Sequence, residues 1–250
     1  EVNPTTDDLV DCFADAIAGN FDSTYSGSKN QLLNFRNYGN NTPVVSLTTT
    51  ENRGNFLNLS CTASSTQTWV ASGSASETIT SNSPNFTYNV SSPALVDIDM
   101  TNPSVSELYM TNCDLTSATI TSNGSLTRID INVNSLTTID FGSNTALEDL
   151  YCNNNNLTSI DLQGCTSLSV LRAYSNTSLT SVTRMNNFTS LLFLDLTNTN
   201  LSSANKDLVY IDLNNNGQSN GTLKMDTGRT SASNSARSSL IANGWTITEV

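Results

Sequence analysis

The feature that most constrains this chain is an apolar pattern that recurs along its second half. Apolar residues stand at offsets 0, 3, 5 and 10 from successive starting points, with one insertion in the fourth unit and a shorter match in the sixth. The starting points are Val105, Leu126, Leu147, Leu168, Leu191 and Leu208, at spacings of 21, 21, 21, 23 and 17 residues. At the apolar content of this chain, one four-position match arises by chance about 2% of the time, so several in phase indicate a true repeat.

A polar position completes the pattern. Offset 8 carries Asn134, Asn155, Asn176 and Asn216, with Cys113 and Thr199 in the other units. A polar side chain there can satisfy backbone groups where the chain turns out of a strand. The whole resembles the leucine-rich-repeat pattern L-x-x-L-x-L-x-x-N/C-x-L. A right-handed parallel β-helix has coils of similar length and is the second candidate, but the Asn position favours leucine-rich repeats.

The resemblance extends to one subtype. The segment LEDLYCNNNNLTSIDLQGCTSL, residues 147–168, is similar to the 21-residue repeats of Bacteroidetes and phage surface proteins. The second half of that repeat, Leu-Thr-Ser-Ile-Asp-Leu, has a counterpart at residues 95–100, which we expect to start the solenoid. The expected fold is mainly β: a solenoid with a parallel concave sheet, preceded by a small β-sandwich and an N-terminal helical segment. Such a protein works by presenting a surface.

The flanking segments differ in pattern. Residues 1–42 predict a helical docking segment, in which Leu9, Phe13 and Ile17 recur at helical spacing and face a partner or the next domain. Residues 43–92 alternate apolar and polar side chains, as in Phe86, Thr87 and Tyr88, and predict short strands of a small β-sandwich. This module weakly resembles immunoglobulin-like or PKD-like domains.

The solenoid itself is expected over residues 93–221. Because end coils expose apolar edges, it needs a cap. Residues 222–250 predict one, as a strand at 223–225, a helix at 231–242 and a final strand from Trp245.

Side chains between the core positions should point outward from the concave sheet. Offsets 2, 4 and 6 mix aromatic rings, carboxylates and amides, which suit a glycan or a protein partner. The alternative is a solvated surface with cross-strand ion pairs such as Asp149 with Arg128 or Arg172. The candidate binding residues are Tyr109, Asp130, Asp149, Tyr151, Arg172, Tyr174, Phe193, Asp195 and Tyr210.

Composition excludes several functions. The formal net charge is −12 and no basic stripe exists, which argues against nucleic acid binding. No apolar run is long enough to insert into a membrane. The chain has no histidine, so the common Ser-His-Asp and Cys-His arrangements are excluded, and we expect neither catalytic residues nor a cofactor.

Metal binding is also not expected. The five cysteines form no CxxC pair and are expected to be mostly free and buried. Residues 212–217 match the first half of a calcium loop, but its twelfth position is Leu223 instead of Glu.

Three functions follow for an extracellular, surface-presenting chain. The first is a phage virion component, namely a fibre, decoration or receptor-binding protein, joined to the virion or to its own copies through the N-terminal segment. The second is a bacterial cell-surface or secreted adhesin. The third is a polysaccharide-processing enzyme, in which carboxylates such as Asp130 and Asp149 would act, but an open sheet excludes little water. In the first two cases the partner is a host-surface glycan or protein.

Overall fold

The computed structural model describes two parts of the chain in different detail. Side chains and backbone are described for residues 105–113, 115–120, 124–185, 188 and 190–250, and strand positions for 45–49, 56–58, 60–63, 68–73, 78–80, 85–87 and 96–100. The chain divides into two units, Glu1–Thr42 and Pro43–Val250. The expected docking residues Leu9, Phe13 and Ile17 lie outside the described residues.

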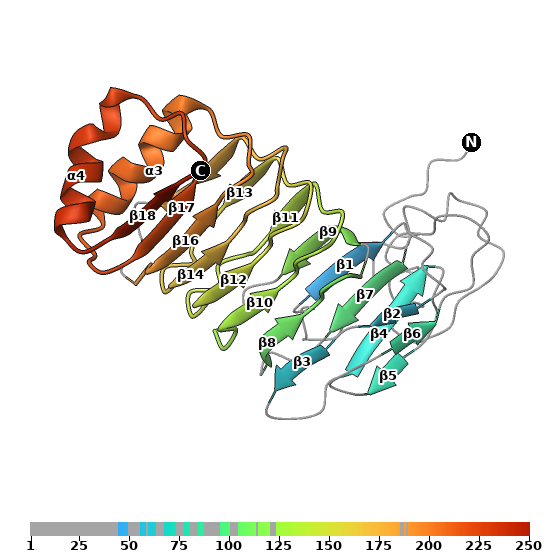
Figure 1. Ribbon diagram of the computed structural model, residues 1–250. Coiled ribbons are helices and arrows are strands. Elements are labelled where there is room, and N and C mark those ends of the chain that lie inside the picture. Colours follow the sequence, from blue (N-terminus) through green and yellow to red (C-terminus); the bar gives the residue numbers. More distant parts are fainter. Residues whose placement is uncertain are drawn as a thin grey trace, which may run out of the picture. The chain divides into compact units, whose positions relative to one another are not determined.

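One long sheet runs through the second unit (Figure 1). Its order is β18-β17-β16-β14-β12-β10-β8-β3. The strands from β8 to β18 are parallel, and β3 pairs with β8 in the antiparallel sense. Their bounds are β3 Ser60–Ala63, β8 Val105–Tyr109, β10 Arg128–Asp130, β12 Asp149–Tyr151, β14 Val170–Arg172, β16 Phe193–Leu196, β17 Thr222–Met225 and β18 Thr246–Glu249.

The second half of each of the first four repeats forms a short strand on the other side of the coil. These are β9 Leu115–Ile120, β11 Thr138–Asp140, β13 Ser159–Asp161 and β15 Ser181–Thr183. A six-stranded sheet has the order β11-β9-β1-β7-β4-β5, while β13 pairs with β15 and β2 pairs with β6. The remaining strands are β1 Val45–Thr49, β2 Phe56–Asn58, β4 Thr68–Gly73, β5 Thr78–Thr80, β6 Asn85–Thr87 and β7 Val96–Met100.

The repeat positions form the core as expected. The residues at offset 3 stack strand upon strand in register and are fully buried: Leu108, Ile129, Leu150, Leu171 and Leu194. The residues at offset 0 from Val105 to Leu191 are equally buried. The parallel sheet, the apolar register and the mainly β content give a leucine-rich-repeat-like solenoid.

An asparagine ladder closes the turns after the strands. Asn155 Oδ1 accepts a hydrogen bond from Leu136 N at 3.1 Å, and its Nδ2 donates to Ile131 O and Cys152 O, both at 3.1 Å. Asn134 and Asn176 repeat this arrangement one coil before and one coil after. Each amide therefore joins two coils by backbone contacts, as the polar position at offset 8 predicted.

The residue before this position turns the chain. Offset 7 adopts a left-handed backbone in every described repeat from the first to the fifth, with φ values of 54° to 56°. The residues are Asn112, Val133, Asn154, Ser175 and Asn198. Asn adopts this conformation at little cost, whereas Val, with its branched Cβ, is strained in it.

The sixth repeat was predicted wrongly. Residues from Leu208 do not form a strand, because they lie in helix α3 (Ser203–Asn215), which Ser202 caps by accepting a hydrogen bond from Asn205 N. Leu208 itself is 53% exposed, while Tyr210 and Leu213 are buried. The sixth place in the sheet is taken by β17, in which Leu223 aligns with Leu194.

The two ends of the solenoid are covered differently. At the C-terminal end, η2 (Ser231–Ser233) and α4 (Asn234–Ala242) pack with α3, and Figure 1 shows both α-helices beside β17 and β18. At the other end, β1 pairs with β9 and β3 pairs with β8. The half repeat at residues 95–100 forms β7. It does not stack directly on β9 as the start of the solenoid, because β1 lies between the two strands. Whether residues 43–92 make a sandwich stays a prediction.

Candidate functional site

The candidate site is the side of the eight-stranded sheet that turns away from the core, which we call the outer face. Strand alternation places the residues at offsets 2 and 4 on it. The parallel register aligns them in two rows. The first row is Glu107, Arg128, Asp149, Val170, Phe193 and Thr222, and the second is Tyr109, Asp130, Tyr151, Arg172, Asp195 and Lys224.

Cations and aromatic rings alternate along this face. Arg128 Cζ lies 5.6 Å from the ring centroid of Tyr109 and 4.4 Å from that of Tyr151. Arg172 Cζ lies 4.8 Å from the Tyr151 centroid and 5.4 Å from the Phe193 centroid. Lys224 Nζ lies 5.5 Å from the Phe193 centroid. These six residues form a continuous cation–aromatic ladder across β8, β10, β12, β14, β16 and β17.

Carboxylates are paired within the two rows. Arg128 lies 3.7 Å from Asp149 and 3.8 Å from Asp130, and Lys224 lies 3.9 Å from Asp195. The Asp149–Arg128 pair confirms one of the two cross-strand pairs considered from the sequence. Because such partly exposed pairs contribute at most about 1 kcal/mol each, their main effect is to hold the side chains in place.

Glu107, on β8 beside the first residue of the ladder, takes part in a hydrogen-bond network. Thr62 Oγ1 donates to its carboxylate at 2.6 Å and Tyr109 Oη donates at 2.9 Å. These two hydrogen bonds lower the pKa of Glu107. Burial, followed by the hydrogen bond to Glu107, raises the pKa of Tyr109. Thr62 of β3 thereby shares an acceptor, Glu107, with Tyr109, the first residue of the ladder.

Arg172 differs from the other two cations. It is exposed, and within the part of the chain that the structure describes it has neither an ion pair nor a hydrogen bond from its side chain. The aligned carboxylate on β16 is Asp195, but that group accepts hydrogen bonds from Thr197 Oγ1 at 2.8 Å and Thr197 N at 3.2 Å. The ladder thus holds one cation without an anionic partner among the described residues.

Most of the sequence-predicted residues meet on this face. Tyr109, Asp130, Asp149, Tyr151, Arg172, Phe193 and Asp195 lie in the two rows. Tyr174 is half-buried two residues after Arg172. Lys224 was not predicted, although the spacing of Leu223 and Met225 matches offsets 3 and 5 and could have placed it.

Tyr210 was placed wrongly by the sequence. It lies in α3, it is fully buried, and its hydroxyl donates to Glu249 Oε1 at 2.8 Å. The sequence assigned it to a sixth repeat strand. Because it lies in α3 instead, it takes no part in the outer face.

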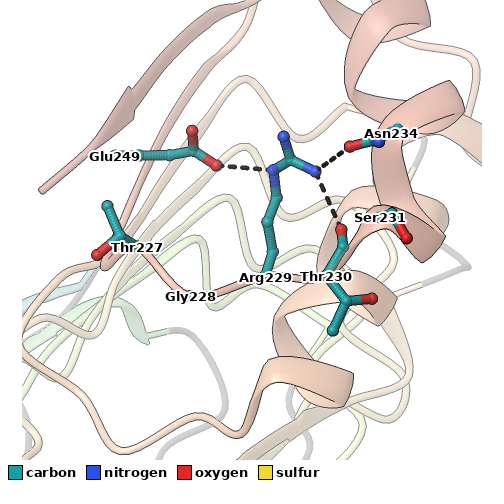
Figure 2. Close-up of a pocket in the computed structure, with 7 residues that line it drawn as sticks. All are labelled: Thr227, Gly228, Arg229, Thr230, Ser231, Asn234 and Glu249. Atoms are coloured by element: carbon teal, nitrogen blue, oxygen red, sulfur yellow. Dashed lines mark hydrogen bonds and ion pairs between the residues drawn. The ribbon is translucent and has the colours of Figure 1, made fainter.

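A pocket of about 340 Å³ lies at the C-terminal cap (Figure 2). Arg229 fills its middle, with Nε 2.9 Å from Glu249 Oε1 and an Nη1 donor 2.6 Å from Asn234 Oδ1. Arg237 also reaches Glu249, at 3.3 Å. Because these polar groups bind one another, their role is to stabilise the cap.

The described residues offer little for chemistry. They contain no cluster that could hold a metal ion. Burial raises the pKa of Cys152 to about 12 and that of Cys165 to about 11, so both thiols are weak nucleophiles at neutral pH. In the same part of the chain, no helix combines the length and apolar content needed to cross a bilayer.

Comparisons with known proteins add little to this picture. No family model matches the chain, and the search of curated proteins finds no match to it. Among solved structures, an internalin from Listeria monocytogenes matches with 16% sequence identity and a TM-score of 0.38, over 60% of this chain. The chain spans about half of that protein, covering 50% of it. The fold assignment therefore rests on the register and core described above.

Proposed function

We propose that this chain is a non-catalytic binding protein that holds an extracellular partner on the outer face. The observation that carries the proposal is the cation–aromatic ladder, whose six side chains are half-buried or exposed. Burial in the core does not explain this ladder, because its side chains lie on the outer face. A face that only contacts solvent does not require cations and aromatic rings to alternate. Tyr and Arg are also the residues that dominate binding energy at interfaces.

The ladder is suited to binding because it is already ordered. Each cation is held against aromatic rings, and Arg128 and Lys224 are also held by carboxylates. A partner that docks on such side chains loses less conformational entropy than one that must order them first. The open sheet and weakly nucleophilic thiols, by contrast, give no support to catalysis.

We place this binding protein on the surface of a phage particle, with a bacterial cell surface as the alternative. The similarity of the repeats to those of phage and Bacteroidetes surface proteins supports the placement. In this proposal residues 1–42 attach the chain to the particle, or to its own copies, through Leu9, Phe13 and Ile17. Mass spectrometry of purified particles and of cell envelopes separates the two sites, since absence from particles would remove the first.

The binding role is tested on the outer face itself. Tyr151→Ala removes a ring that lies against Arg172, and Tyr174→Ala removes the half-buried ring two residues after it. Both changes should abolish attachment of the particle or cell to its target. Arg184→Gln is the matched control, because Arg184 follows β15 on the other side of the coil and pairs only with Asp161, at 3.3 Å, among the residues described. Attachment that survives both tyrosine changes would sink the proposal.

A further inference from the structure

We infer that Arg172 receives a carboxylate from an Asp or Glu side chain of a protein partner. The inference rests on the proposed function, because it names the chemistry of the partner that the outer face would hold.

Each charged side chain in the two rows has an ion pair or a hydrogen bond within the described part of the chain, except Arg172. Asp149 pairs with Arg128 at 3.7 Å, and Lys224 has Asp195 at 3.9 Å. The other two carboxylates in the rows also have partners: Glu107 accepts from Thr62 and Tyr109, and Asp130 accepts from Thr111 Oγ1 at 3.2 Å. A partner therefore meets one charged side chain in the two rows that has neither an ion pair nor a hydrogen bond among the described residues, and it is positive.

Arg172 is also held in position for a directed contact. Tyr151 and Phe193 lie on neighbouring strands, on either side of it, at 4.8 Å and 5.4 Å from its Cζ to the ring centroids. Stacking fixes the plane of a guanidinium and leaves its N–H edge free. A carboxylate matches that edge with two parallel hydrogen bonds.

The ring faces favour a protein over a glycan. Sugars bind aromatic residues by covering a ring face, but Tyr151 has Arg128 and Arg172 over its ring from the strands on either side. Phe193 has Arg172 and Lys224 over its ring in the same way. What the ladder presents is ring edges and guanidinium groups, a combination that suits the side chains of a protein surface.

The test uses a displayed library of random dodecapeptides selected against the whole chain. Selected binders should share an acidic residue. Arg172→Gln should weaken their binding about tenfold or more, since a charge-assisted pair is lost. Arg184→Gln should leave the affinity unchanged. Replacing the acidic residue of the peptide by its amide should weaken binding to the wild type by the same factor. The same replacement should not weaken binding to Arg172→Gln any further, as a double-mutant cycle requires.

Other outcomes separate this inference from the proposed function. Binders that are lost in Tyr151→Ala and Tyr174→Ala but kept in Arg172→Gln would overturn the role of Arg172 and leave the binding face intact. Binders indifferent to all three changes, or no binders, would overturn both. Polygalacturonate, an acidic polysaccharide, serves as the second probe: if it binds through Arg172 more tightly than any peptide, the protein assignment is overturned. Circular dichroism confirms that each variant is folded.

Discussion

At the residue scale, two positions of each repeat decide whether a coil closes. The amide at offset 8 satisfies backbone groups of two coils, and the residue at offset 7 supplies the left-handed turn before it. Both positions are polar in nearly every repeat, and the sequence pattern predicted the role of the one at offset 8. The turn conformation was not predicted, because composition alone does not report a backbone angle.

Replacing Asn155 by Ala should lower the free energy of unfolding by about 3 kcal/mol, because it leaves buried donors and acceptors of two coils unsatisfied. Asn155 is 4% exposed and makes four hydrogen bonds to backbone atoms. Urea denaturation measures the change. Asn156→Ala, at the exposed neighbouring position, is the control and should change stability by less than about 0.5 kcal/mol. Equal effects would contradict the ladder's structural role.

Val133 should be replaceable with a gain. Its φ is 55°, where a β-branched residue is strained, and its side chain is 45% exposed. Val133→Asn should raise the free energy of unfolding by about 1 kcal/mol, since Asn stands at this position in three other coils. The reverse change, Asn154→Val one coil later, should lower it by a similar amount. Denaturation of the two variants side by side checks the sign.

At the element scale, helix α3 lies where the repeat pattern predicted a sixth strand. Leu208 and Ile211 are three residues apart, a spacing that both a leucine-rich-repeat strand and an α-helix allow. Helix α3 is chosen by its cap at Ser202 and by the burial of Asp207, Tyr210 and Leu213 against the rest of the cap. Ser202, a residue type favoured at helix N-caps, was the signal that could have revealed it.

Asp207 holds this helix to the rest of the cap. Its carboxylate accepts hydrogen bonds from Thr230 N at 3.0 Å and from the Thr230 and Ser233 hydroxyls, both at 2.5 Å. Asp207→Ala should lower the free energy of unfolding by about 2 kcal/mol, because these donors lose a charged acceptor. Hydrogen exchange of α4 and β18 should speed up first. Asn215→Ala, exposed on the same helix, is the control and should leave exchange unchanged.

The same carboxylate should make the cap sensitive to acid. Burial raises the pKa of Asp207, but hydrogen bonds from Ser233 and Thr230 outweigh it, so the net shift is downward from 3.8. A lowered pKa contributes stability that is present above the unfolded value and is lost as pH falls through the folded value. The acid loss of stability should therefore be smaller in Asp207→Ala than in the wild type.

At the scale of the whole molecule, the strands before the repeats are joined to the solenoid by pairing. β1 aligns with β9 along five residue pairs, and β3 lies on the open edge of β8. Thr62 of β3 also binds Glu107. These strands therefore serve as the N-terminal counterpart of the helical cap, since each covers an end that would otherwise expose unpaired backbone.

Removing residues 1–92 should leave a chain that aggregates, because it exposes the edges of β8 and β9. Removing only residues 1–42 should leave a soluble, folded chain, since the second unit begins at Pro43. Size-exclusion chromatography and far-ultraviolet circular dichroism of the two truncations measure this. A monomeric, folded chain after the longer truncation would show that the β-module is an independent domain instead of a cap.

The repeat pattern by itself determined the core and the outward rows. Apolar residues such as Leu150 and Leu171 recur at one phase, and strand alternation then fixes that Tyr151 and Arg172 point the other way. Tertiary structure alone decided the insertion of β1 beside β9, the choice of α3 over a sixth strand, and which cations find carboxylates. The reason is physical: periodicity reports which side of an element is buried, whereas pairing between distant segments depends on what packs against that element.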